Sequence, residues 1–117
     1  MVTDALEPKA GEVWNVDFSP QVGREQAGVR PVLVISHERF NRLRNDPHIV
    51  VPITGADRGL AYHITFDSPE GGLTKVSQIM CEQEKSQSVE RFIDRRGVVS
   101  NQTLRQVREI VTELIDD

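Results

Sequence analysis

Residues 23–36, which read Gly-Arg-Glu-Gln-Ala-Gly-Val-Arg-Pro-Val-Leu-Val-Ile-Ser, decide how this chain folds. A polar loop bounded by glycines runs into the apolar residues 32–35, which are rich in β-branched side chains. A short apolar run of this kind is typical of a strand that is buried on both faces. Arg30 stands where the loop meets the strand, so a rigid scaffold can hold its guanidinium. Because a fixed guanidinium is suited to binding phosphate, Arg30 is the first candidate for a functional residue.

The segments around this stretch have the patterns of short strands. Residues 12–18 place Trp14, Val16 and Phe18 on one face, and this period of two is typical of a half-buried strand. Further strands are expected at residues 29–36, at about 48–54, at 61–67 and at 73–82, with a single helical turn within 37–43. Residues 87–96 have a mixed pattern, and we interpret them as one short helical turn.

The C-terminal segment has the clearest helical pattern. Ser100 or Asn101 can cap a helix, and apolar side chains follow at offsets of three and four residues. These side chains are Leu104, Val107, Ile110, Val111, Leu114 and Ile115. Such a stripe is expected to pack against a sheet. Several short strands followed by this helix predict an α+β fold, in which a small curled antiparallel sheet carries a packed C-terminal helix.

Length and composition limit the possible classes of protein. A chain of 117 residues with 38% hydrophobic and 27% charged residues suits one globular domain, and we expect a flexible lead at 1–10 and a domain at 11–117. No apolar run approaches the roughly 20 residues that cross a membrane, and residues 1–9 do not resemble a secretory signal. The single cysteine, Cys81, cannot form an intrachain disulfide, so a cytoplasmic location is expected. We interpret Cys81 as a small buried or half-buried residue and not as a nucleophile. The few scattered histidines show no metal-ligand spacing, so neither a metal nor another cofactor is expected.

The charge argues against a protein that coats nucleic acid. The net charge is −4, but most of the arginines lie between positions 24 and 96, while the acidic excess lies mostly at the two ends. A local basic groove is therefore compatible with the sequence, and so is a set of ordinary solvated surface arginines.

Taken in order, several motifs resemble those of the MazF/PemK toxins, which are small bacterial endoribonucleases of toxin–antitoxin pairs. The loop Gly23-x-Glu25-Gln26-Ala27-Gly28-x-Arg30-Pro31 before an apolar strand is similar to the signature loop of this family. The similarity continues in Trp14-x-Val16-Asp17-Phe18-x-Pro20, Phe40-Asn41, Val51-Pro52-Ile53-Thr54, Glu82-Gln83-x-Lys85-Ser86 and Gly97-x-Val99. It covers roughly residues 11–115, and it is specific because of the order and spacing of the motifs. The resemblance implies a small SH3-like antiparallel barrel with the C-terminal helix packed on it.

The resemblance also implies metal-independent cleavage of single-stranded RNA at a short sequence. In this reaction the 2′-hydroxyl attacks the phosphorus and leaves a 2′,3′-cyclic phosphate and a 5′-hydroxyl. Arg30 and Thr54 match the positions usually assigned to catalysis, where a cation stabilises the developing charge and a hydroxyl bonds a phosphate oxygen. Without the resemblance, an ion pair with Glu25 or Asp17 is the preferred explanation of Arg30. For Thr54 it is a β-branched strand residue that begins a turn.

Other residues of the motifs are candidates for further roles. Glu25 is a catalytic candidate that could orient Arg30 or accept the 2′-hydroxyl proton, although a solvated carboxylate explains it equally well. The remaining candidates for RNA binding are Arg24 and Gln26 on the loop, Gln83 for base edges, and Lys85 and Ser86 for phosphates. Glu84 departs from the family pattern, in which small or apolar residues are more usual, and strand alternation predicts that it points away from Gln83 and Lys85.

The implied partners are RNA, an antitoxin and a second copy of the chain. The resemblance implies a homodimer with RNA in a groove at the subunit interface, and an antitoxin whose acidic segment covers that groove. Two alternatives share the fold. One is a protein-binding toxin that poisons DNA gyrase and lacks the pair of Arg30 and Thr54. The other is a degenerate member that only binds RNA or an antitoxin.

Overall fold

The computed structural model describes residues 7–18, 28–43, 47–55, 63–66, 70–72 and 77–115. Its strands are β1 (Glu12–Asp17), β2 (Val29–Val34), β3 (Pro47–Thr54), β4 (His63–Phe66), β5 (Ser77–Met80), β6 (Lys85–Ser88) and β7 (Phe92–Val98). The helices are α1 (Glu38–Asn41) and α2 (Asn101–Ile115), and single 3-10 turns occur at η1 (Glu70–Gly72), η2 (Cys81–Gln83) and η3 (Val89–Arg91).

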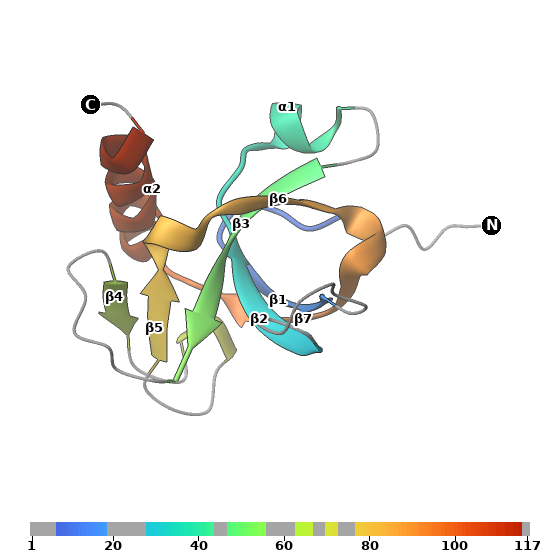
Figure 1. Ribbon diagram of the computed structural model, residues 1–117, viewed down its shortest axis with the longest axis horizontal. Helices are drawn as coiled ribbons and strands as arrows, with labels where there is room; N and C mark the ends of the chain where they lie inside the picture. Colours follow the sequence, from blue (N-terminus) through green and yellow to red (C-terminus); the bar gives the residue numbers. More distant parts are fainter. Residues whose placement is uncertain are drawn as a thin grey trace.

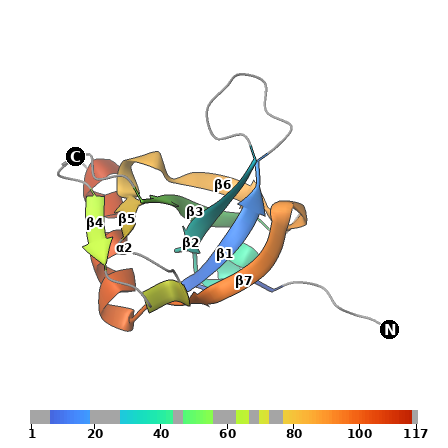
Figure 2. The same ribbon diagram turned by 90° about the horizontal axis from the view of Figure 1, so that it is seen from below.

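The strands form one antiparallel sheet in the order β4-β5-β3-β2-β1-β7, and β6 pairs with β3 beside this path. Figures 1 and 2 show that the sheet is strongly curved and that α2 lies beside β4 and β5. The predicted α+β fold is therefore confirmed. The pairings among the described residues run from β4 to β7, with β6 beside β3, and the sheet that they form is strongly curved (Figure 2).

Strand β2 is buried on both faces, as the apolar run predicts. Val32, Leu33 and Val34 are all 0% exposed. Alternate residues of the strand enter two different cores, which we name by their contents. The helix-side core contains Val13, Leu33, Ile35, Val51, Ile53, Ile79, Cys81, Val99, Val107 and Val111. The aromatic core contains Trp14, Val16, Phe18, Val32, Val34, Val50 and Phe92. The sheet thus has two distinct faces. When one residue of a strand lies in a known core, alternation along the strand gives the face on which each of its other side chains lies.

Helix α2 begins with a side-chain cap. The Oγ of Ser100 accepts a hydrogen bond of 3.1 Å from the backbone N–H of Thr103, which identifies Ser100 as the capping residue. The predicted stripe packs on the sheet through Val107 and Val111, both of which are buried. Leu114 and Ile115 at the end of the stripe are exposed. No helix in the described part of the chain is long and apolar enough to span a membrane.

The short helical turn predicted within residues 87–96 is η3. The prediction missed that this turn joins two strands, β6 and β7. Strand β7 contains Asp94, Arg95 and Arg96, so its composition has no apolar alternation. Its strand conformation depends on the antiparallel ladder with β1, which includes two irregularities in register.

The end of the predicted strand at 73–82 also differs. In the described part of this segment the strand covers only Ser77–Met80, and Cys81–Gln83 form the 3-10 turn η2. The chain then continues through Glu84 into β6.

The end of the expected lead contacts the sheet before the first strand begins. Pro8 is buried, and its carbonyl oxygen lies 3.2 Å from Nε2 of His48. Gly11 then donates a backbone hydrogen bond of 2.8 Å to Val34. These contacts attach residues 8–11 to strands β2 and β3.

Candidate active site

The side chain of Arg30 lies on the face of the aromatic core. In the ladder between β1 and β2, Arg30 is directly opposite Val16, which is 0% exposed in that core. Residues directly opposite each other in an antiparallel ladder project to the same side of the sheet. Arg30 itself is exposed, because it stands near the start of β2, where the buried part of the strand has not yet begun. The scaffold therefore presents this guanidinium at one end of the face.

Thr54 lies on the same face. Pro52 is directly opposite Val32 of the aromatic core, and alternation along β3 returns Thr54 to the side of Pro52. The ladder between β2 and β3 ends at this pair, and Figure 1 shows the two strands diverging beyond it. Arg30 and Thr54 thus stand at the diverging ends of neighbouring strands, with both side chains on one side of the sheet.

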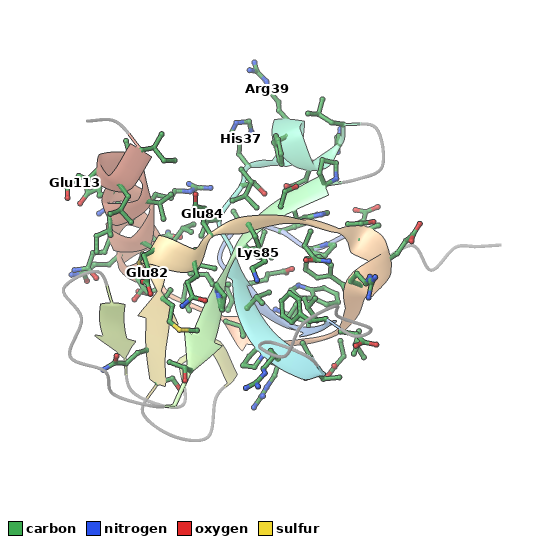
Figure 3. The ribbon with its side chains drawn as sticks, viewed as in Figure 1. His37, Arg39, Glu82, Glu84, Lys85 and Glu113 are labelled. Atoms are coloured by element: carbon green, nitrogen blue, oxygen red, sulfur yellow. The ribbon has the colours of Figure 1, made fainter. Side chains whose placement is uncertain are left out.

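Lys85 adds a second cation to this face. It is directly opposite Val50 of the aromatic core, and its Nζ lies 4.8 Å from the centroid of the Phe18 ring. Figure 3 shows the side chain pointing from β6 toward the interior of the curved sheet. Burial lowers the pKa of Lys85 below its usual value of 10.5. We call the surface shared by Arg30, Thr54 and Lys85 the Arg30 face.

Glu84 and Ser86 do not share this face. Figure 3 shows Glu84 on the other side of β6 from Lys85, as strand alternation predicts. Ser86 is directly opposite Ile49, which packs against the helix-side core. The structure therefore separates Ser86 from Lys85, although the two are neighbours in the motif.

Gln83 lies in the turn η2 and not in a strand. It is half-buried, and its Nε2 donates a hydrogen bond of 3.4 Å to Oε2 of Glu82. The adjacent Cys81 is 0% exposed in the helix-side core, which confirms its interpretation as a buried residue. Burial, with a smaller effect from Glu82, raises the pKa of the Cys81 thiol to about 11, so the thiol is protonated at neutral pH.

One alternative explanation of Arg30 loses support. Asp17 is directly opposite Val29 and so alternates to the other face from Arg30. No ion pair between described residues involves Arg30. The other suggested partner, Glu25, lies outside the described residues together with Arg24 and Gln26, so their roles stay predictions. Within the described ranges, no group of three or more His, Cys, Asp and Glu could hold a metal ion.

Two contacts at the base of the loop were not apparent from the sequence. The backbone N–H of Phe18 donates a hydrogen bond of 2.9 Å to Gly28, which closes the two ends of the loop. Nη1 of Arg91 donates to the carbonyl oxygen of Asp17 at 3.4 Å. Phe18 therefore links the loop to Lys85. The sequence did indicate that Phe18 points inward, but its contact with a strand 67 positions away depends on tertiary pairing.

Comparisons with known proteins agree on one family. The family model for the PemK-like, MazF-like toxin of type II toxin–antitoxin systems matches residues 9–115. The endoribonuclease EndoA of Bacillus subtilis is 35% identical over 103 residues, which cover 86% of this chain and 88% of that protein. The crystal structure of MazF from Deinococcus radiodurans superposes with a TM-score of 0.78 at 25% identity, covering 94% of this chain and 97% of that one.

A further solved structure shows the same fold at lower identity. It is an endoribonuclease in complex with its cognate antitoxin from a Mycobacterial species, with a TM-score of 0.75 at 17% identity, covering 93% of this chain and 95% of that one. The family model spans nearly the whole chain, and the motifs around Arg30 and Thr54 lie inside the matched region. The chain therefore belongs to the PemK-like, MazF-like toxin family of type II toxin–antitoxin systems.

Proposed function

We propose that this protein is a toxin of the bacterial cytoplasm that cleaves single-stranded RNA at a short sequence and needs no metal ion. The observation that carries this proposal is the common placement of Arg30, Thr54 and Lys85 on one face of the sheet. Two cations and a hydroxyl group on one surface suit a phosphodiester backbone. The Bacillus subtilis relative, which is named an endoribonuclease, supports the same activity.

The mechanism assigns one task to each group. The 2′-hydroxyl of the RNA attacks the adjacent phosphorus, the bond to the 5′-oxygen breaks, and the products carry a 2′,3′-cyclic phosphate and a 5′-hydroxyl. Arg30 stabilises the additional negative charge of the phosphorane, and Thr54 donates a hydrogen bond to a phosphate oxygen. Glu25 is the candidate to accept the 2′-hydroxyl proton, or else it orients Arg30. A proton must also reach the departing 5′-oxygen, and the N–H groups of Arg30 and solvent water are the candidate donors for this step.

Binding of the rest of the RNA uses the surroundings of this pair. Lys85 binds a neighbouring phosphate, while Gln83 contacts base edges from the turn η2. Arg24 and Gln26, on the loop before β2, contact the RNA. Ser86 faces the other side of β6, so it would contact a different part of the RNA from Lys85.

The partners follow from the same chemistry. We propose a homodimer that binds RNA at the subunit interface, and an antitoxin whose acidic segment places carboxylates where RNA phosphates bind. Inhibition by the antitoxin would then be competitive with RNA and weakened by salt. The similarly folded Mycobacterial endoribonuclease was solved with its cognate antitoxin, which supports a protein partner for this fold.

The proposal is tested with purified protein and a mixed-sequence RNA in excess EDTA. We expect cleavage that persists without free metal, with fragments that end in a cyclic phosphate. The same sequence made with 2′-O-methyl sugars should stay intact, because it has no 2′-hydroxyl nucleophile. Intact unmodified RNA, in EDTA and with added magnesium, would contradict the proposal and favour a protein that only binds RNA or another protein.

The lowered pKa of Lys85 predicts how RNA binding changes with pH. Lys85 binds phosphate only as the ammonium ion, so affinity should fall as the pH rises through its lowered pKa, before ordinary lysines titrate. Affinity for a 2′-O-methyl RNA should be measured from about pH 7 to about pH 10, below the range in which arginine titrates. Lys85→Arg is the matched control. Because arginine stays charged over this range, the loss of RNA affinity at alkaline pH should be smaller in this variant. Equal losses in both proteins would show that Lys85 does not bind the RNA.

A further inference from the structure

One polar side chain is buried beside the proposed catalytic pair and has no role so far. Gln78 stands within β5, where its side chain is only 8% exposed. The amide of a glutamine is usually exposed, and burial requires that its polar atoms find hydrogen bonds. The position of Gln78 in the sheet indicates which group this amide can bond.

Gln78 lies directly opposite Thr54 in the ladder between β3 and β5. The preceding pair, Ile53 and Ile79, belongs to the helix-side core, so the pair of Thr54 and Gln78 alternates to the other side. That side is the Arg30 face. Directly opposed residues of an antiparallel ladder have Cβ atoms about 4.5–5.5 Å apart, which brings the glutamine amide within reach of the threonine hydroxyl.

We propose that Gln78 is a positioning residue for Thr54, which holds the threonine hydroxyl so that its proton points toward the RNA phosphate. This inference rests on the proposed function. The amide N–H of Gln78 donates to Oγ1 of Thr54, and the hydroxyl proton is then left to bond a phosphate oxygen. A hydroxyl can donate only one hydrogen bond, so a neighbouring donor sets the direction in which that bond is made. Fixing it before the substrate arrives is the preorganisation that stabilises developing charge.

The adjacent Ser77 provides a matched control. It is buried to a similar degree, at 4% exposure, and it stands on the same strand. It precedes Gln78 by one residue and therefore alternates to the other face of the sheet. A purely structural effect of a buried polar group in β5 would be felt at both positions, whereas positioning of Thr54 is possible only from Gln78.

The test compares steady-state cleavage kinetics of Gln78→Met and Ser77→Ala with those of the wild type. Methionine keeps the length of glutamine but removes the amide, so kcat should fall about tenfold with KM nearly unchanged. Ser77→Ala should keep the wild-type kcat. In Gln78→Glu the carboxylate accepts a hydrogen bond from the Thr54 hydroxyl, which turns the hydroxyl away from the RNA, and it also repels phosphate. The loss of kcat should therefore exceed that of Gln78→Met.

A double-mutant cycle separates positioning from stability. In a Thr54→Ala background, Gln78→Met should cause no further loss of kcat, because the group that it positions is absent. An equal loss in both backgrounds, or an unchanged kcat in the single variant, would overturn the inference. If Thr54→Ala has no measurable rate, the comparison with Ser77→Ala decides, and if Gln78→Met does not fold, Gln78→Asn removes the reach of the amide instead. A wild-type protein that fails to cleave RNA would overturn the proposed function itself, which is a distinguishable result.

Discussion

Replacing Arg30 by alanine is expected to slow RNA cleavage by about a thousandfold, because the variant loses the preorganised cation that stabilises the phosphorane. The fold should be unaffected. Arg30 is exposed near the start of β2, and no described residue forms an ion pair with it, so its removal should change the free energy of unfolding by less than about 0.5 kcal/mol. Single-turnover cleavage of RNA and thermal unfolding of the same preparation measure the two effects.

Two further variants make this result specific. Arg39→Ala removes an exposed arginine from α1, which changes the net charge equally but should leave the rate unchanged. Arg30→Lys keeps the charge but loses the planar fork with several donors, so its rate should lie between those of the wild type and the alanine variant. If Arg30→Ala cleaves as fast as Arg39→Ala, then Arg30 has no part in catalysis.

The fold was predictable where a short segment carries its own signal. The apolar run at residues 32–35 predicted a strand buried on both faces, and residues 32–34 form its fully buried part. The apolar stripe in α2 predicted the helix, and Ser100 at its start is one of the two predicted caps. In these segments the local pattern of apolar side chains predicts burial, so the structure can be predicted without knowing which other segments pack against them.

Strands β6 and β7 were not predictable in the same way. β7 contains Asp94, Arg95 and Arg96, and its one deeply buried apolar residue, Phe92, packs beside Trp14 with ring centroids 5.7 Å apart. The strand forms because its backbone pairs with that of β1 in an antiparallel ladder. This is a tertiary effect, and the sequence of the segment alone does not contain it.

The site was predictable in part for the same reason. A motif pointed to Arg30 and Thr54, but their common face follows from the registers of β1 with β2 and of β2 with β3. The registers between distant segments also place Ser86 on the other face from Lys85 and Gln78 directly opposite Thr54. Local patterns thus identified most of the chemistry, whereas the sheet determines which groups act together.

Gly97, which belongs to one of the motifs, has a structural reason to be glycine. A Cβ atom at this position would lie 2.6 Å from the carbonyl carbon of Gly71 and 2.6 Å from the nitrogen of Gly72. These are backbone atoms of η1, where it crosses β7, so they cannot move aside as a flexible side chain would. Gly97→Ala should therefore force η1 away from β7 and destabilise the fold by about 3 kcal/mol. The midpoint of thermal unfolding should fall by about 10 °C or more.

Gly28→Ala is a comparison for this prediction, because its cost is backbone strain without a steric clash, whereas the cost at Gly97 is steric. Gly28 has a φ of +88°, but a Cβ atom there would meet nothing within 4 Å. Its replacement should cost about 1–2 kcal/mol through backbone strain alone, which is less than the steric cost at Gly97. A loss of less than about 0.5 kcal/mol in Gly97→Ala would show that the crossing of η1 and β7 is loose enough to admit a methyl group. The requirement for glycine in the motif would then need another explanation.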